Sequence, residues 1–161
     1  MKEKKVRNKF LQVVSYILRG IAFLLVIFSL LFLSAFTFIR ISHKLSEGPR
    51  LFAQALTDVA FMGPFKTTWI FVWEAISGII FAYILLLMAK FVANVSRDII
   101  FDRENVRYLR KMTISAIVVS FVITSEGIVD ISSLFLALTF FLFSIILSRA
   151  ITIAEEQEFT V

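Results

Sequence analysis

The chain has 161 residues, of which 59% are hydrophobic and 19 are Phe, and its formal net charge is +5 at pH 7. A soluble domain is about 45 to 50% apolar, so this composition predicts an integral membrane protein without a separate soluble domain. Cysteine is absent and His43 is the single histidine, which excludes a disulfide framework, a thiolate nucleophile and the usual ligand sets of zinc. We therefore expect no cofactor and no metal.

The first predicted element is a basic amphipathic segment over residues 1–19, whose Lys and Arg can meet anionic lipid while its apolar side chains insert. A charge-free run of twenty residues follows at 20–39, between Arg19 and Arg40. At 1.5 Å per residue this run crosses a hydrocarbon core of about 30 Å. It predicts a first transmembrane helix that is retained, because a signal peptide has a shorter apolar region of about 7 to 15 residues.

Residues 40–66 form the predicted first outer loop. Its stretch Ser46-Glu47-Gly48-Pro49 combines an N-cap with a proline near a first helical turn, and apolar residues then recur at helical spacing. We expect a short amphipathic helix on the outer leaflet, which ends near Pro64 before the chain returns to the membrane.

The second predicted span covers residues 67–89, with Trp69 and Trp73 near its start, where indole rings favour the membrane interface. It holds one ionisable residue, Glu74, and such a residue inside a span is a functional candidate by default. Because Glu74 lies about two turns from the outer end of the helix, within reach of water or Lys66, an interfacial or structural role is favoured over proton or ligand binding.

A basic inner loop at residues 90–111 leads into a third predicted span at 112–124, whose helix is expected to begin within the loop. Asp102 is the expected N-cap of that helix. Basic side chains then recur at helical spacing: Arg103, Arg107, Arg110 and Lys111. Two interpretations of this stripe stay open, an electrostatic anchor to anionic headgroups and a docking surface for a partner.

The fourth predicted span is the charge-free run 131–148, preceded by an outer turn whose acidic residues, Glu126 and Asp130, are expected to face water. The chain ends in an acidic tail at residues 149–161, with carboxylates at Glu155, Glu156 and Glu158. The basic inner loop is the nearest partner for this tail, so an intramolecular clamp is one expectation. The alternative is a solvated tail, since exposed ion pairs are typically worth only about 0 to 1 kcal/mol each.

The distribution of positive charge predicts the orientation. Thirteen of the 17 Lys and Arg lie in the N-terminal segment, the 90–111 loop and the tail, and four lie in the first outer loop. Cytoplasmic segments retain positive charge, so both termini are expected in the cytoplasm. The predicted fold is an all-α, integral membrane four-helix bundle formed by a single domain over residues 1–161.

Two short motifs resemble those of a known family. Phe101-Asp102-Arg103-Glu104-Asn105-Val106 with Leu109, and Glu155-Glu156-Gln157-Glu158-Phe159-Thr160-Val161, look like the paired signatures of a bacterial family of small four-span membrane proteins of unknown function. That family reads approximately Phe-x-x-x-Asn-Val-x-x-Leu in the loop and Glu-x-x-Leu-Thr-Val in the tail. Phe159 stands where Leu is usual, and the third span lacks the glycine expected soon after the loop. Members are commonly paired with a small DNA-binding regulator of helix-turn-helix or LytTR type, and some inhibit it.

The resemblance implies a protein of the bacterial cell membrane that inhibits a cognate cytoplasmic transcription regulator by sequestering it, without contacting nucleic acid itself. The residues expected to form the docking surface are Arg103, Asn105, Arg107, Arg110, Lys111, Glu155, Glu156 and Glu158. A small transport or permeation component, or a lipid-interacting protein, is the alternative. An enzyme is not expected, because the chain has no His pair, no Cys and no close carboxylate pair at membrane depth. Besides the bilayer and the regulator, a second copy of the chain remains a candidate partner.

Overall fold

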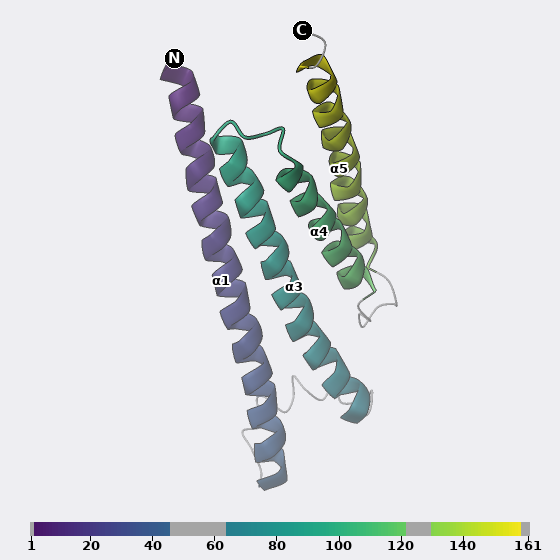
Figure 1. Ribbon diagram of the computed structural model, residues 1–161. Helices are drawn as coiled ribbons and strands as arrows, with labels where there is room; N and C mark the ends of the chain where they lie inside the picture. The colour runs from purple at the N-terminus through teal and green to yellow at the C-terminus, as the bar shows by residue number, and fades with distance from the viewer. Residues whose placement is uncertain (1, 46–63, 122–129, 159–161) are drawn as a thin grey trace.

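The computed structural model describes residues 2–45, 64–121 and 130–158, and these residues form four α-helices (Figure 1). The helices are α1 (Lys2–Leu45), α3 (Pro64–Ser96), α4 (Arg103–Ser120) and α5 (Ile131–Glu158). The all-α prediction is confirmed. The amphipathic helix expected within the first outer loop, and Glu126 in the second outer turn, lie outside the described residues.

Three of these helices have apolar stretches long enough to cross a membrane: Val6–Phe38 in α1, Val72–Ser96 in α3 and Ile131–Gln157 in α5. The chain therefore has the character of a membrane protein. Helix α4 is not one of the three, because five of its first nine residues are charged. Of the third span expected at residues 112–124, the structure describes the part up to Phe121, which includes the apolar second half of α4.

Helix α1 continues without a break through Gly20, the expected boundary between the basic segment and the first span. The chain has only two prolines, Pro49 and Pro64, and neither lies within α1. Helical hydrogen bonds do not end where the hydrocarbon ends, so α1, α3 and α5 all extend past the spans expected from apolar residues alone. At 1.5 Å per residue, α1 is about 66 Å long.

The helices pack in chain order as an open row, with α1 against α3, α3 against α4, and α4 against α5 (Figure 1). Among the described residues, the backbones of α1 and α5 do not approach each other. The expected four-helix bundle is therefore not closed. The physical reason is that lipid tails are as apolar as a leucine side chain, so no hydrophobic force closes a bundle inside a membrane.

Small side chains at a spacing of seven residues hold the antiparallel helices α1 and α3 together. The buried positions of this small-residue seam are Ser15, Ala22 and Ser29 on α1 and Ala75, Ala82, Ala89 and Ser96 on α3. A repeat of seven is that of left-handed helix pairs, and small residues let two backbones approach closely. At Ser15 the hydroxyl donates to the Ala89 carbonyl over 2.8 Å, which satisfies a buried polar group across the seam.

A second region of packing centres on α4. Leu109, Met112 and Ala116 form a buried stripe at helical spacing and contact apolar side chains from both neighbouring helices. These neighbours are Ile84 and Leu87 of α3 and Ala137 and Phe140 of α5. Helix α4 thus buries one stripe between two helices, and its charged residues are left on the opposite, exposed stripe.

Candidate functional site

The first turns of α1, the last turns of α5 and the turn between α3 and α4 lie at the same end of the row (Figure 1). We call this the basic end; it consists of the first turns of α1, residues 97–102, the first half of α4 and the last turns of α5. The loop motif belongs to it, as do Glu155 to Glu158, the described part of the tail motif.

The turn that leaves α3 has a fixed backbone. The Asp98 amide donates to the Val95 carbonyl over 3.1 Å and the Ile99 amide to the Asn94 carbonyl over 3.0 Å, which is the bonding of a Schellman motif. Asp98 has a φ of 62°, a conformation that glycine adopts readily and that Asp tolerates better than most residues. Arg7 of α1 pairs with the Asp98 carboxylate at 3.9 Å, so the turn is also connected to α1.

Helix α4 begins with the N-cap expected from the sequence. Asp102 has an extended backbone, and its carboxylate accepts a hydrogen bond from the Glu104 amide over 2.8 Å. This satisfies one of the free amides of the first helical turn. The prediction that Asp102 caps this helix is confirmed.

Asn105 holds the α3–α4 turn from inside. Its amide group donates to the carbonyls of Ile99 over 2.7 Å and Ile100 over 3.0 Å, and its Oδ1 accepts from the Asn94 amide group over 2.8 Å. The side chain is 0% exposed. The expectation that Asn105 belongs to a docking surface is therefore corrected, because a fully buried side chain whose hydrogen bonds are directed inward has no surface to offer a partner.

Three large apolar side chains project from the turn that Asn105 fixes. Ile99 is 44% exposed, Ile100 37% and Phe101 62%. Their backbone is held by the two carbonyl hydrogen bonds to Asn105, while their side chains remain accessible. We call these three residues the apolar tip. Sequence reasoning missed it, although three consecutive large apolar residues between Asp98 and Asp102 were a visible signal.

An ion pair joins the loop motif to the tail motif. The Arg103 guanidinium donates to the Glu155 carboxylate from Nη2, at 2.9 and 3.1 Å, and from Nε, at 3.3 Å. This hydrogen bonding and the charge of Glu155 raise the pKa of Arg103. The expected contact between basic loop and acidic tail is confirmed for this pair. Glu156 lies exposed on the next position of α5, and the side chain of Glu158 lies outside the described residues.

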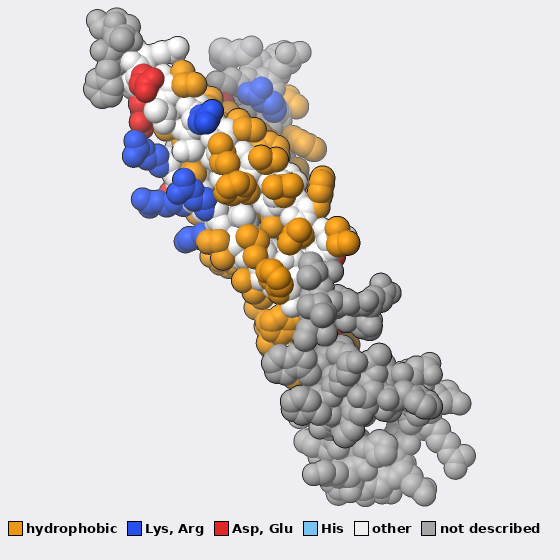
Figure 2. Space-filling view, turned by 90° about the vertical axis from the view of Figure 1, so that its right-hand side faces the viewer, with side chains coloured by type: hydrophobic (Ala, Val, Ile, Leu, Met, Phe, Trp, Pro, Cys, Tyr) orange, Lys and Arg blue, Asp and Glu red, His pale blue; other side chains and the backbone are white. Residues whose placement is uncertain are grey.

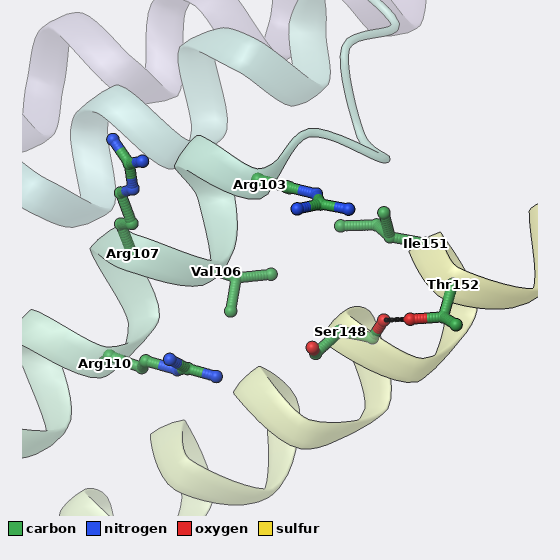
Figure 3. A pocket seen from close by; sticks show the side chains of 7 residues that line it. All are labelled: Arg103, Val106, Arg107, Arg110, Ser148, Ile151 and Thr152. Atoms are coloured by element: carbon green, nitrogen blue, oxygen red, sulfur yellow. Dashed lines mark hydrogen bonds between the residues drawn. The ribbon is translucent and has the colours of Figure 1, made fainter. Parts of the chain in front are cut away.

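The cations of α4 differ in what they face. A groove of about 340 Å³ lies between α4 and α5, and its walls are Arg103, Val106, Arg107, Arg110, Ser148, Ile151 and Thr152. Figure 3 shows Arg103 and Arg110 extending toward α5 on either side of Val106, and Arg107 extending in another direction. Lys111 is exposed and is not part of the groove.

Two acidic residues predicted near the outer surface lie away from the basic end. Glu74 is exposed at the beginning of the apolar stretch of α3, the position of an interfacial residue. Asp130 caps α5, because its carboxylate accepts hydrogen bonds from the Ser132 amide at 3.0 Å and the Ser133 hydroxyl at 2.5 Å. These bonds, with that from Ser133 the largest cause, lower the pKa of Asp130. Asp130 was expected only to face water, and the cap is an additional role.

Comparison of the chain with known protein families, with curated proteins and with solved structures gave no match. A function for the basic end is therefore argued from its residues and their arrangement.

Proposed function

We propose that this protein is a membrane-bound regulatory protein that inhibits a cytoplasmic DNA-binding regulator by holding it at the cell membrane. In this proposal the chain crosses the membrane four times, with α4 and the residues after it as the third span. The basic end lies in the cytoplasm with both termini, because most of the Lys and Arg belong to it.

The observation that carries the proposal is the meeting of the two motifs. Arg103 belongs to the loop motif and Glu155 to the tail motif, and although 52 residues separate them in the chain, their side chains pair at 2.9 Å. The motifs on which the resemblance rests therefore contribute to one surface. A shared surface is what a docking site for one partner requires.

The apolar tip supplies the second argument. Interface hot spots are enriched in aromatic residues and Arg, and Phe101 lies in the chain within two residues of Arg103. Both side chains are exposed, and Phe101 is held on a backbone that cannot easily retract it because of the Asn105 hydrogen bonds. Such a rigid anchor reduces the entropy lost on binding. The proposed docking surface is therefore the apolar tip together with the Arg103–Glu155 pair.

Inhibition by sequestration requires only that the membrane protein bind the regulator in its DNA-free state more tightly than in its DNA-bound state. The docking surface combines residues from the α3–α4 turn and from the last turns of α5. A partner that contacts both would be sensitive to a displacement of α5 against α4, which gives a signal a physical route to release it.

The test is co-purification of the regulator with the tagged full-length protein in mild detergent, combined with transcription of a regulator-dependent reporter. Phe101→Ala is expected to abolish co-purification and derepress the reporter at unchanged membrane abundance. Phe143→Ala is the matched control, because Phe143 is 57% exposed on the apolar face of α5, and it is expected to leave both readouts unchanged.

A charge swap shows whether the partner needs the paired conformation of Arg103 and Glu155 or recognises their individual charges. Arg103→Glu and Glu155→Arg are each expected to weaken co-purification, and the double variant restores the pairing with reversed polarity. Recovery in the double variant means that the joined conformation is needed, whereas no recovery means that the partner reads the individual charges. Wild-type repression in Phe101→Ala and in both single charge variants would contradict the proposal.

The alternative of a small transport component is less well supported by the described part of the chain. The buried polar residues of the described spans are mainly serines, and several of them bond to carbonyls of their own helix, as Ser77 does to Glu74 and Ser144 to Phe141. The hydrogens of these hydroxyls are donated within their own helix, so they are not available to a solute that needs a hydrogen-bond donor.

A further inference from the structure

The groove between α4 and α5 has the chemistry of an anion site. Its walls carry three guanidinium groups, from Arg103, Arg107 and Arg110, and two hydroxyl-bearing residues, Ser148 and Thr152. Its volume of about 340 Å³ falls within the range of about 300 to 1,000 Å³ typical of small-ligand sites. Guanidinium groups bind phosphate and carboxylate oxygens through two parallel hydrogen bonds.

The net charge of the groove is positive even after the acidic residue beside it is counted. Glu155 neutralises the charge of Arg103 at the rim of the groove through their ion pair. Arg107 and Arg110 remain, and Arg110 extends over the groove toward α5 (Figure 3). The Thr152 hydroxyl donates its hydrogen to the Ser148 carbonyl over 3.1 Å, and the hydroxyl oxygen can still accept a hydrogen bond. Ser148 also lines the wall of the groove.

The surroundings of the groove point to a lipid. Beyond its basic residues, the exposed side chains of α4 and of its C-cap Phe121 are apolar, with Ile114 63%, Ile117 40% and Phe121 58% exposed. From Arg110 to Phe121 the helix rises about 16 Å, roughly half of a hydrocarbon core. The apolar part of this surface is therefore as long as one leaflet of the hydrocarbon core is thick. The basic stripe lies just beyond it, at the level that lipid headgroups occupy.

On α5, the exposed side chains before Ser148 are likewise apolar. Phe141, Leu142 and Ile145 are exposed, and they precede Ser148 by one to two helical turns. Figure 2 shows several blue side chains along one edge of the described surface, beside a central area that is largely orange. A ligand with an anionic head and apolar chains matches this surface in both of its parts, whereas a soluble anion matches the basic part alone.

We propose that the groove between α4 and α5 is a binding site for one anionic phospholipid. Its phosphate is bound by Arg110, with Arg107 at the rim and hydroxyl groups in the wall, and its acyl chains lie along the exposed apolar residues of α4 and α5. Arg107 and Arg110, which are assigned to the phosphate, belong neither to the apolar tip nor to the Arg103–Glu155 pair, so their substitution tests the lipid site separately from the docking of a regulator.

The test is a titration of the full-length protein in mild detergent with phosphatidylglycerol or phosphatidylcholine of identical acyl chains, followed by native mass spectrometry. The wild type is expected to bind phosphatidylglycerol about tenfold more tightly, the factor that roughly one charge-assisted hydrogen bond supplies. In Arg107→Gln with Arg110→Gln this preference is expected to vanish.

The matched control is Arg19→Gln with Arg97→Gln, which removes two exposed arginines outside the groove. It is expected to keep the tenfold preference, which separates a site from general electrostatic attraction to the basic end. Circular dichroism shows whether each variant retains its helix content. If a variant unfolds, Arg110→Gln alone against Arg97→Gln alone gives the same comparison.

Two results would overturn the proposal. An equal loss of preference in the groove variant and its control would mean that only total charge matters. Displacement of the lipid by glycerol 3-phosphate at the concentration at which the lipid itself binds would mean that the groove holds a soluble phosphate, since that compound has the head without the chains.

Discussion

The α1–α3 pair and the α4–α5 pair are both antiparallel, but they are held together in opposite ways. The first pair joins through small side chains at a spacing of seven, with a hydroxyl at Ser15 directed across the contact. The second pair packs through larger side chains such as Met112 and Phe140 and is connected by polar groups at both ends. Arg103 pairs with Glu155 at one end, and the Asp130 amide donates to the Ser120 carbonyl over 2.8 Å at the other.

The first pair, α1 and α3, therefore serves as structural support, whereas the second pair, α4 and α5, carries the candidate functional site. In the described part of the α1–α3 contact, the buried positions of the seam carry small, uncharged side chains. The second pair leaves a groove with cations on its walls and brings the two motifs together. The comparison leads us to expect that substitutions in the first pair act through steric fit and substitutions in the second pair act through polar contacts.

The largest effect is expected from Asn105→Ala, which removes a side chain that satisfies two carbonyls and one side-chain amide. Leaving these buried groups without partners is expected to cost about 3 kcal/mol of unfolding free energy, measured by denaturant titration in detergent micelles. Asn94→Ala is the control, because Asn94 makes only one of these side-chain bonds, and its cost is expected to be about 1 kcal/mol. Equal costs for the two variants would contradict the role assigned to Asn105.

A smaller effect is expected in the first pair from Gly78→Ala. A Cβ at this position would collide with the Ser29 hydroxyl but would lie at an ordinary contact distance of 3.4 Å from the Ser29 Cβ. The Ser29 hydroxyl must turn to another rotamer, which costs about 1 kcal/mol, and Ser29→Ala in the same chain is expected to recover most of this cost. A double-mutant cycle on the unfolding free energy measures this coupling.

Gly20→Ala provides the control for that cycle. Nothing lies within 4 Å of a Cβ built at Gly20, so the substitution should stabilise the helix by about 0.5 to 1 kcal/mol through its propensity alone. If Ser29→Ala changed the unfolding free energy equally with Gly or Ala at position 78, the close approach of α1 and α3 at Ser29 would be refuted.

The smallest effect is expected from the cap of the second pair. Asp130→Ala should cost about 1 kcal/mol, the usual contribution of an N-cap. The pKa of Asp130 is lowered from its ordinary value of 3.8, so the native state favours the carboxylate, and this contribution is complete above that value. It is lost as the pH falls through the lower folded pKa. Asp130→Asn keeps a hydrogen-bond acceptor but has no titrating group. Between about pH 5 and pH 2, a range set by the ordinary carboxyl pKa, the unfolding free energy of this variant should therefore fall less than that of the wild type.

Much of the fold could be predicted because long runs of apolar residues without charge indicate helices that lie in lipid. The charge-free runs at residues 20–39 and 131–148 lie inside α1 and α5, and the cap at Asp102 followed from the preference of Asp for that position. The row could not be predicted, since apolarity shows that a helix lies in lipid but not which of its faces meets another helix. The spacing of seven in α1 and α3 was the available signal for one contact.

The candidate site was predicted less completely. The pairing of loop and tail followed from opposite charges at the same end of the molecule, and Arg103 and Glu155 confirm it. Asn105 was assigned to the docking surface because it belongs to the loop motif on which the family resemblance rests. Its burial depends on the turn at Asp98, whose left-handed conformation directs the carbonyls of Ile99 and Ile100 toward α4, and residue type alone does not reveal this.

The length of α1 has a mechanical consequence. A helix of about 66 Å without proline behaves as a stiff rod, and the small-residue seam guides this rod along α3. A rotation or a shift imposed on its far end would arrive at the basic end without being absorbed at a hinge. There Arg7 pairs with Asp98 in the turn before the apolar tip, so a displacement of α1 along α3 would alter a contact of the turn that carries the tip.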